Sequence, residues 1–423
     1  MTKKSDAPAI RFKGFSDAWE QREVGDLLIE RSQQAPMSDE YPLMAFIANE
    51  GVAPKGERYD RSALVTDTVN KLYKKTEKGD FIYSSNNLET GSIGLNKYGK
   101  ACISPVYSIF EPTGIADSDF LGRRLVRKDF INAMVKWRQG VIYGQWRIHE
   151  SDFLKIEISV PSVEEQRKIG AYLDQLDNLI TLHQRKFEKL TNVKKSMLEK
   201  MFPQNGSSYP EIRFKGFTDP WEQRKLGDIG KARSGVGFPD AEQGGVTGIP
   251  FFKVSDMNLG GNENEMTVAN NYVTAEQIAV HRWSPITELP AIFFAKVGAA
   301  VMLNRKRLCR FPFLLDNNTM AYSLSSTKWD ADFARALFGT VDLTSLVQVG
   351  ALPSYNAGDV ESMEIYLPSL LEQEQIGGFF KQLDNLITLH QRQTIVYAVI
   401  RSIRKVILAE RQYFAPPMVR KSP

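Results

Sequence analysis

The chain has 423 residues, of which 42% are hydrophobic and 25% are charged, fractions that are ordinary for folded globular proteins. This composition excludes a fibrous or wholly disordered chain, and the length predicts two or three domains. The 54 basic and 50 acidic residues leave a net charge of only +4, so the overall charge does not identify a polyanionic partner. A nucleic-acid surface must therefore be sought in local clusters.

Cysteine usage and hydropathy favour a cytoplasmic protein. Cys102 and Cys309 lie in different halves, which argues against a disulfide framework and a thiolate metal site. Residues 1–9 carry two lysines but no apolar run, and no segment approaches 18 consecutive apolar residues. We therefore expect no export signal and no membrane span.

A duplicated block opens the chain. The segment IRFKGFSDAWEQREVGDL at 10–27 recurs as IRFKGFTDPWEQRKLGDI at 212–229, with 13 of 18 positions identical. A match of this length does not arise by chance. An offset of 202 residues indicates two related domains rather than a solenoid of short units.

The segments that follow the two copies do not match each other. In the first half, apolar and β-branched enrichment between glycine and asparagine turns predicts strands at 81–84, 101–104 and 154–160, and the pattern at 129–139 predicts a helix. We therefore expect this first insert to be a loop-rich mixed α/β domain.

A second duplicated block closes each half. PSVEEQRKIGAYLDQLDNLITLHQR at 161–185 returns as PSLLEQEQIGGFFKQLDNLITLHQR at 368–392, with 17 of 25 positions identical and an offset of 207 residues. Pro-Ser ahead of acidic residues is typical of a helix start, because serine caps free amides and carboxylates favour the positive helix end. No proline interrupts 163–202, which predicts a helix of about 39 residues and roughly 58 Å.

The first of these helices carries a broad apolar stripe at heptad spacing, which predicts a face buried against another helix. The residues of the stripe are Ile169, Tyr172, Leu173, Leu176, Leu179, Ile180, Phe187, Leu190, Val193, Met197 and Met201.

In the second half, a linker is expected at 205–208, strands at 250–254, 291–295 and 321–324, and a helix at 331–337. The second long helix continues differently from the first. Val396, Ile400, Ile403 and Ile407 keep helical spacing but shift the stripe, which predicts a register change or kink near Gln393.

We therefore predict an α+β fold in which two mixed α/β target-presenting domains are joined by two long antiparallel coiled-coil helices with an internal pseudo-twofold repeat. The alternative is that each long helix packs on its own domain. The expected boundaries are 1–160 for the first start block and domain, 161–204 for the central helix, 205–367 for the second start block and domain, and 368–423 for the C-terminal helix.

Catalytic signatures are incomplete. Residues 94–100 match the GxxxxGK part of a phosphate-binding loop, but Ala101 replaces the magnesium-binding Ser or Thr. Asp-Pro-Trp at 219–221 only partly resembles an amino-methyltransferase motif, so Trp221 is expected to be structural. His183 and His390 occupy equivalent positions of the repeat, where an interface role is favoured over metal binding. We expect no catalytic, cofactor or metal site in this chain.

Residue types suited to DNA reading cluster in both inserts, because lysines neutralise phosphates while Asn and Arg can bond adenine and guanine edges. The alternative is that charge runs form solvated faces and Ser-Asn pairs form turns. The candidates are Lys74, Lys75, Ser84, Ser85, Asn86, Asn87, Lys97, Tyr98, Lys100, Arg138, Tyr143, Gln145 and Arg147 in the first insert, and Lys253, Ser255, Asp256, Asn258, Asn304, Arg305, Lys306, Arg307, Asn317 and Asn318 in the second.

The repeated WEQR, the repeated Pro-Ser with Glu-Gln shortly after it, and LDNLITLHQR in both helices resemble the specificity subunits of Type I restriction-modification systems. GDFIYSSNN at 79–87 and GIPFFKVSDMN at 248–258 are similar to target-recognition segments of that family. The resemblance spans nearly the whole chain. It departs from the family pattern after Arg392, which leaves open whether the two scaffold ends bind partners equally.

The resemblance implies that each insert reads one half of a bipartite double-stranded DNA site and that the helices fix the unread spacer. Two methylation subunits would dock on the scaffold, and restriction subunits would join the complex. S-adenosylmethionine, ATP and Mg would be bound by those partners and not by this chain. Two other readings stay open, namely a self-contained DNA-modifying enzyme and a coiled-coil adaptor that does not read DNA.

Overall fold

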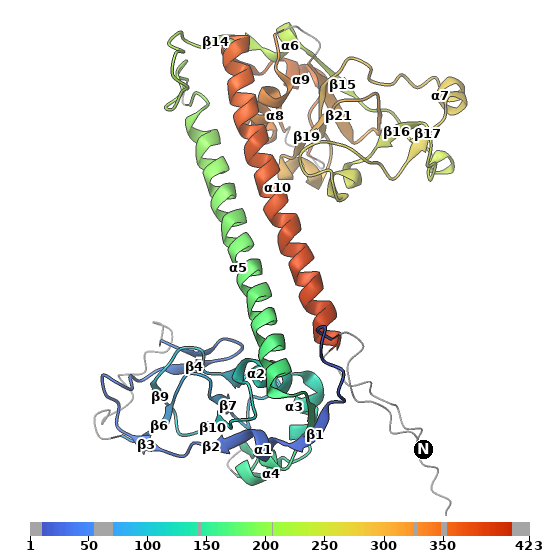
Figure 1. Ribbon diagram of the computed structural model, residues 1–423. Helices are drawn as coiled ribbons and strands as arrows, with labels where there is room; N and C mark the ends of the chain where they lie inside the picture. The colour runs from blue at the N-terminus through green and yellow to red at the C-terminus, as the bar shows by residue number, and fades with distance from the viewer. Residues whose placement is uncertain are drawn as a thin grey trace, which may run out of the picture. The chain divides into compact units, whose positions relative to one another are not determined.

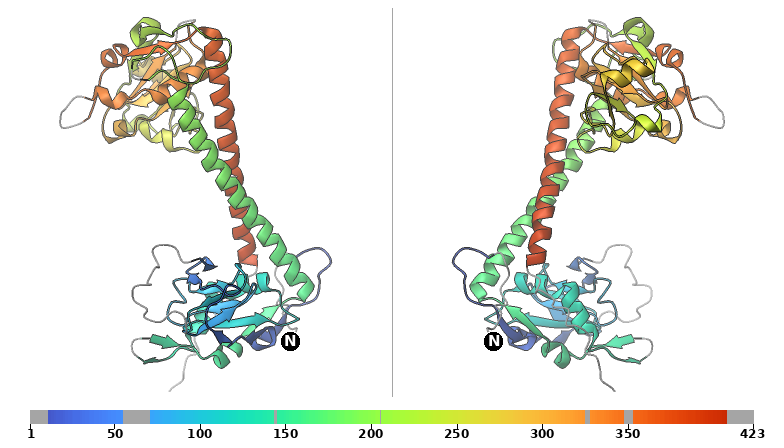
Figure 2. Two further views of the ribbon diagram at one scale, coloured as in Figure 1. Left: turned by 90° about the vertical axis from the view of Figure 1, so that its left-hand side faces the viewer. Right: turned by 90° about the vertical axis from the view of Figure 1, so that its right-hand side faces the viewer.

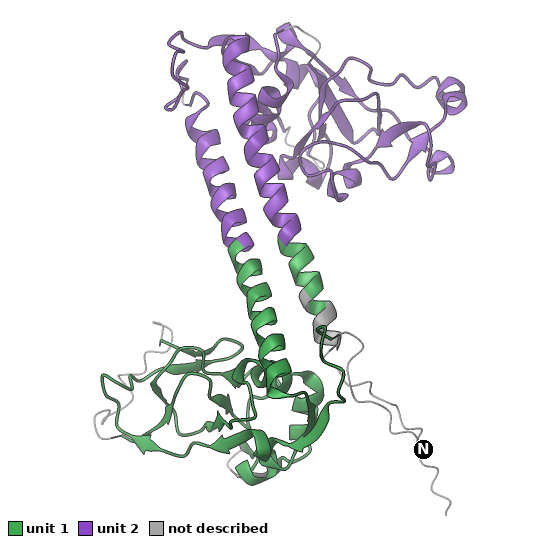
Figure 3. Ribbon diagram, in the orientation of Figure 1, with its two compact units in different colours: residues 1–182, 394–423 green, residues 183–393 purple. Residues whose placement is uncertain are grey.

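The computed structural model describes residues 11–54, 71–142, 145–204, 206–324, 328–347 and 353–407. The chain forms two compact units (Figure 3). Unit 1 comprises Met1–Leu182 and Thr394–Pro423, and unit 2 comprises His183–Gln393. Each unit contains one insert together with a part of each of two long helices, α5 (Val163–Lys200) and α10 (Leu370–Ile407) (Figure 1).

A four-stranded antiparallel sheet forms the centre of unit 1. Successive side chains of a strand point to opposite faces. Phe81 and Tyr83 therefore enter one core with Phe153, while Ile82 enters a second core with Phe46 on the other face. Both faces of the sheet are buried. Its strands, in spatial order, are β2 (Leu28–Glu30), β10 (Ser108–Pro112), β7 (Phe81–Tyr83) and β8 (Ile93–Leu95).

Smaller sheets and short helices surround this centre. The further sheets of unit 1 are β3 (Gln34–Ala35), β6 (Tyr73–Thr76) and β9 (Ala101–Ile103); β4 (Ala45–Ile47) and β5 (Gly51–Ala53); β1 (Glu20–Glu23) and β13 (Glu157–Val160); and β11 (Gln139–Ile142) and β12 (Gln145–Arg147). Its short helices are α1 (Val24–Leu27), α2 (Ser118–Leu125), α3 (Lys128–Val135) and α4 (Glu150–Leu154).

Unit 2 repeats the plan of unit 1. Its four-stranded sheet consists, in spatial order, of β15 (Lys231–Ser234), β21 (Thr319–Ser323), β18 (Ala291–Ala295) and β19 (Lys306–Cys309). A three-stranded sheet contains β17 (Tyr272–Val273), β16 (Ile249–Phe252) and β20 (Leu314–Leu315). A two-stranded sheet pairs β14 (Glu222–Lys225) with β22 (Glu364–Leu367). Its short helices are α6 (Leu226–Ile229), α7 (Ala275–His281), α8 (Ala331–Thr340) and α9 (Ala357–Glu361), with 3-10 turns η3 (Asp240–Glu242), η4 (Val254–Asn258), η5 (Ala299–Leu303) and η6 (Leu343–Leu346).

Most strand and helix predictions are confirmed to within a few residues. The predicted strands at 81–84, 101–104, 250–254, 291–295 and 321–324 correspond to β7, β9, β16, β18 and β21, and the two predicted short helices correspond to α3 and α8. The prediction for 154–160 was wrong in its first part, because Glu150–Leu154 is helical and the strand begins at Glu157. The helix places Phe153 among the aromatic rings of the core, and this tertiary contact outweighs the local pattern.

The two long helices pack against each other within unit 2 and also against the core of that unit. Leu190 and Val193 of α5 pack on the same core as Phe380 and Leu383 of α10. Lys194 Nζ lies 2.5 Å from Asp384 Oδ1, and His183 pairs with His390. Residue numbers rise on one helix as they fall on the other, so the helices are antiparallel there. The two packing arrangements that the sequence left as alternatives therefore occur at the same time. Each long helix buries its apolar stripe both against its own domain and against the other helix.

In unit 1 the last described turns of α10 meet the first turns of α5. Tyr397 and Ile400 pack on the core that contains Leu173 and Leu176. The predicted register change near Gln393 was wrong, because α10 is unbroken from Leu370 to Ile407 and Tyr397, not Val396, continues the buried stripe. Within the described ranges, no helix combines the length and apolar character needed to cross a membrane.

The residues that repeat between the halves fasten each insert to its long helix. In unit 1 the Arg11 guanidinium makes two hydrogen bonds to the buried carboxylate of Glu165, at 2.9 and 2.5 Å. In unit 2 Arg213 makes the equivalent bonds to Glu372, at 2.8 and 2.7 Å. We call each of these pairs the latch of its unit.

A second repeated contact lies beside each latch. Gln166 Oε1 accepts the backbone N–H of Asp117 at 2.9 Å, and Gln373 Oε1 accepts that of Asp330 at 3.0 Å. Both aspartates cap short helices, α2 and α8. Gly377 of α10 lies against the same aspartate, Asp330. A Cβ at this position would lie 2.3 Å from Asp330 Oδ1, so only glycine allows this close approach. The duplicated motifs are thus explained as docking chemistry for the inserts.

Candidate nucleic-acid interface

Two groups of polar residues that the sequence analysis singled out separately meet in unit 1. The loop that follows β7 carries Ser85 and Asn86, and the hairpin of β11 and β12 lies against it. Asn86 Oδ1 accepts the backbone N–H of Trp146 at 2.7 Å, and Ser85 Oγ accepts that of Ile148 at 3.0 Å. The hairpin projects from the edge of unit 1 (Figure 2). We call the loop 84–92 together with the strands β11 and β12 the unit 1 candidate surface.

Arg138 adds a further connection between this loop and the hairpin. Its guanidinium makes two hydrogen bonds to the carboxylate of Glu89, at 3.0 and 2.7 Å, and lies 6.0 Å from the centre of the Trp146 ring. Of the predicted amide and hydroxyl residues of the loop, Asn87 is exposed and Ser84 is buried. Asn87 is therefore the amide of this loop that solvent, and hence a ligand, can reach.

Lys74 and Arg147 act on the same carboxylate, Glu150, at the base of the hairpin. Burial would raise the pKa of Glu150, but the hydrogen bond from Ser108 and the charges of Lys74 and Arg147 outweigh it and lower the pKa. The Arg147 side chain is 68% exposed and lies 4.0 Å from Glu150, so its guanidinium remains open to an anion.

Lys75 and Lys100 surround Tyr41 on the neighbouring β6–β9 sheet. The Lys75 ammonium lies 4.2 Å from the centre of the Tyr41 ring, and Lys100 pairs with Glu40. The Tyr41 hydroxyl donates to Glu77 at 2.5 Å. These two lysines form a mixed patch in which acidic neighbours offset part of the positive charge.

Lys97 connects the insert to the helices. Its ammonium lies 3.1 Å from Asp174 of α5 and 3.7 Å from Asp119 of α2. Its neighbour Tyr98 is exposed. Tyr143 lies outside the described residues, and of Gln145 only the backbone, as the first residue of β12, is described.

In unit 2 the segment 253–258 forms the turn η4, and its polar residues have different surroundings. Asp256 is fully buried and accepts hydrogen bonds from the backbone N–H groups of Lys253 and Asn270. Ser255 and Asn258 are exposed. Asp256 therefore shapes the turn, while Ser255 and Asn258 are presented to solvent.

The basic cluster 304–310 is largely engaged within unit 2. Lys306 Nζ donates to Asn304 Oδ1 at 2.7 Å and to the Val341 carbonyl, and burial lowers its pKa to about 8. Arg307 donates to the Asn262 carbonyl at 2.5 Å, and burial lowers its pKa also. These two side chains brace loops of the unit.

Arg305, Asn317 and Asn318 complete the predicted residues of unit 2. Arg305 Nη1 donates to Asn258 Oδ1 at 2.8 Å, so η4 and the start of β19 share one surface. Asn317 and Asn318 are exposed at the turn between β20 and β21, and the Asn318 backbone N–H donates to Asp316. The structure thus brings Asn258 and Arg305 together as a candidate surface of unit 2.

Sequence reasoning missed Trp146. The indole is 45% exposed on β12 between the two strand neighbours that were predicted, Gln145 and Arg147. An aromatic residue within a short run of polar residues was the available signal.

The incomplete catalytic motifs have structural explanations. Residues 94–100 run from β8 to β9 with no helix after them, whereas a phosphate-binding loop needs a following helix. Trp221 is buried and packs edge-on against Phe333. His183 Nδ1 lies 2.8 Å from His390 Nδ1 between the long helices, and the described residues contain no cluster of three or more metal-ligating side chains.

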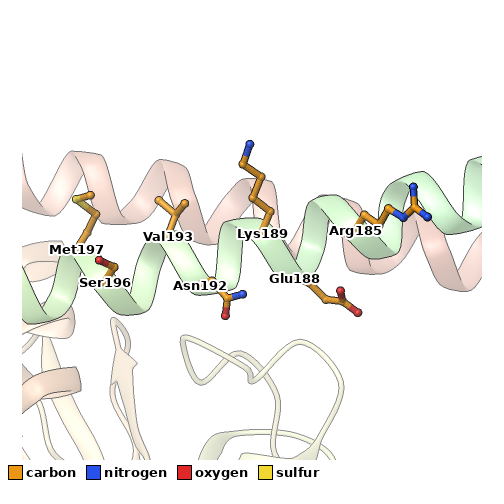
Figure 4. Close-up of a pocket in the computed structure, with 7 residues that line it drawn as sticks. All are labelled: Arg185, Glu188, Lys189, Asn192, Val193, Ser196 and Met197. Atoms are coloured by element: carbon orange, nitrogen blue, oxygen red, sulfur yellow. The ribbon is translucent and has the colours of Figure 1, made fainter. Parts of the chain in front are cut away.

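The solvent face of the scaffold differs between the two copies of the repeat. An open hollow beside α5 in unit 2 is lined by polar residues that include Glu188, Lys189 and Asn192 (Figure 4). The repeat-equivalent residues of α10 are Ile395, Val396 and Val399, which are 56%, 54% and 51% exposed. One copy of this face is therefore polar and the other apolar.

Comparisons with known proteins agree with this architecture. The family model described as "Type I restriction modification DNA specificity domain" matches residues 17–192 and 218–396. The Type I restriction enzyme MjaVIII specificity subunit of Methanocaldococcus jannaschii is 22% identical over 410 residues, which cover 89% of this chain and 88% of the relative. The MjaIX specificity subunit of the same organism is 24% identical over 271 residues, or 62% of each chain.

A solved structure shares the fold. The crystal structure of the Type I restriction-modification system S subunit from M. genitalium aligns with a TM-score of 0.58 at 14% identity, and the alignment covers 96% of this chain and 100% of that one. The family model matches well over half of the chain, once in each half. This chain therefore belongs to the family of Type I restriction-modification DNA specificity subunits.

Proposed function

We propose that this chain is the non-catalytic DNA-reading subunit of a Type I restriction-modification complex and that each insert reads one half of a bipartite, asymmetric site. One observation carries the proposal: the same latch and the same glutamine contact hold two inserts whose exposed polar surfaces differ. An identical mounting for different surfaces suits a protein that reads two different sequences with one geometry.

The reading segments are 1–160 and 205–367, and the scaffold helices are 161–204 and 368–423. Exposed cations such as Arg147 would contact phosphates, while exposed amides such as Asn87, Asn258 and Asn317 would reach base edges. The helices would fix the unread spacer and dock two methylation subunits, which bind S-adenosylmethionine. Restriction subunits that use ATP and Mg would join through the complex in the cytoplasm.

The test is to reconstitute the chain with its methylation subunits, modify genomic DNA, and map the methylated adenines. The expected result is a two-part motif. Exchange of residues 28–160 for those of another family member should change one part of the motif and leave the other unchanged. The chain alone should show no methyltransferase or nuclease activity.

Two outcomes would contradict the proposal. Methylation by the isolated chain would favour a self-contained enzyme. An assembled complex that binds duplex DNA without sequence preference, or not at all, would favour an adaptor.

A further inference from the structure

The hairpin of the unit 1 candidate surface exposes a large aromatic side chain on a strand whose backbone is held in place. Trp146 lies on β12, with 45% of its surface exposed, and the hairpin projects from unit 1 (Figure 2). Indoles contribute much of the affinity at interfaces when they become covered. An exposed indole on a projecting hairpin therefore indicates a contact with something outside the chain.

Three contacts hold the backbone at Trp146 and at Ile148, two residues later. The Trp146 N–H donates to Asn86 Oδ1 at 2.7 Å, and the Ile148 N–H donates to Ser85 Oγ at 3.0 Å. The Tyr83 hydroxyl donates to the Ile148 carbonyl at 3.4 Å. These bonds fix β12 to the loop that follows the central strand β7, so the indole loses little conformational entropy when it binds.

Arg138 supports the ring itself. Its guanidinium lies 6.0 Å from the ring centre and is held by two hydrogen bonds to Glu89, and its side chain is only 12% exposed. Arg138 is thus a positioning residue. Arg147, which follows Trp146 on β12, presents its guanidinium to solvent.

The chemistry of this surface fits duplex DNA better than an apolar protein face. Trp146 and Arg147 follow each other on β12 and therefore point to opposite faces of the hairpin, so a hairpin that lies in a groove of duplex DNA would meet base edges on one face and a phosphate on the other. A purely apolar partner would have to bury the Arg147 charge with only Glu150, 4.0 Å away, as its counter-ion, which is costly.

We propose that Trp146 contacts the bases of the half-site read by unit 1, that Arg147 contacts a neighbouring phosphate, and that Asn86 and Arg138 position the indole. This inference rests on the proposed function and names the residue that carries base contact in one of the two halves.

The experiment uses the complex reconstituted with its methylation subunits and a duplex that carries the mapped two-part motif. Thymines near each half are replaced in turn by 5-iodouracil, the complex is irradiated, and the cross-linked peptide is identified. We expect cross-links at Trp146 from one half only. Cross-links from neither half to the peptide that contains Trp146 would overturn the inference.

Binding affinity gives a second readout. Loss of one contact to a base pair should weaken binding about 10-fold for Trp146→Ala, with partial recovery for Trp146→Phe. Asn86→Ala should weaken binding less, because it frees the strand but keeps the indole. Trp137→Ala, which removes another exposed tryptophan of unit 1, is the matched control and should change affinity less than 2-fold.

The possible failures are distinguishable. If the wild-type complex shows no two-part motif, the proposed function fails. If the motif is present but Trp146→Ala binds it as tightly as wild type does, the inference fails while the function stands. If Trp146→Ala instead prevents assembly with the methylation subunits while the chain keeps its far-UV circular dichroism spectrum, the indole contacts protein, and the inference also fails.

Discussion

At the residue scale, the chain places two deeply buried carboxylates opposite arginines from the start blocks. Glu165 and Glu372 are each about 1% exposed, and each accepts two hydrogen bonds from one guanidinium. Removal of one partner from such a buried pair leaves an uncompensated charge, which costs far more than the loss of a pair on the surface.

Arg213→Ala should therefore destabilise unit 2 by about 3 kcal/mol. Arg224→Ala removes an arginine whose pair with Glu222 is exposed, and it should cost less than about 1 kcal/mol. Urea unfolding followed by tryptophan fluorescence measures both values. Equal losses for the two variants would show that the latch does not hold the insert.

The histidine pair should make the free energy of unfolding of the chain depend on pH. Burial, the charge of His390 and the charge of Lys186 lower the pKa of His183. The unfolded imidazole, with its ordinary pKa of about 6.5, binds a proton more readily than the folded one. Protonation therefore favours the unfolded chain, and the free energy of unfolding decreases as the pH falls below about 6.5.

The free energy of unfolding of the wild-type chain should thus decrease between pH 7.5 and 5.5 more steeply than that of His183→Gln. His149→Gln, outside the long helices, is the control and should follow the wild type. Denaturant titrations at several pH values provide the measurement. A wild-type profile that coincides with that of His183→Gln would contradict this assignment.

At the element scale, the two long helices share their buried stripe but differ on their solvent face. Heptad spacing continues through Ile376, Leu383, His390 and Tyr397, and Tyr397 is still half-buried beyond the point where the two sequences diverge. What differs is the exposed side of the two helices. At equivalent positions of the repeat, α5 carries the polar Glu188 and α10 carries the apolar Ile395. The difference is therefore one of surface chemistry and not of the heptad spacing.

The combined exchange Ile395→Glu, Val396→Lys and Val399→Asn gives α10 the residues of α5. If this face docks a methylation subunit, the loss of its apolar contacts should cost about 2 kcal/mol, or roughly 30-fold in affinity, at one of the two docking positions. Calorimetric titration with the methylation subunit measures both affinities. The reverse exchange on α5 is the matched control, and unchanged titrations for both variants would exclude this face from docking.

At the scale of the whole molecule, the two units share sheet order and latch but differ in the chemistry of their exposed loops. Unit 1 presents Asn87, Trp146 and Arg147, whereas unit 2 presents Asn258 and Asn317.

Affinity of the assembled complex for duplex DNA should fall linearly with salt concentration on a log–log plot, since phosphate contacts release counterions. Arg147→Ala should reduce that slope by about 1. Lys306→Ala should leave the slope unchanged, because the Lys306 ammonium is already bound to Asn304 and Val341. A slope that responds to Lys306 and not to Arg147 would reverse these assignments.

The sequence alone determined the duplication, the α+β class, the long helices and the family, because repeated motifs and heptad spacing are visible without knowledge of which residues touch. The start block and the helical block repeat because they dock on each other, and this shared constraint is written in both copies. Trp221 could likewise be recognised as structural from the repeat.

Only the tertiary structure decided which polar residues are presented to a ligand. Lys306 and Arg307 belong to the densest basic cluster of the sequence, yet burial and carbonyl contacts engage them inside unit 2. Ser85 and Asn86 brace a strand about 60 residues away in the sequence, and it is Trp146 on that strand that is exposed. Side-chain exposure depends on contacts between segments far apart in the chain, and a linear pattern does not record them.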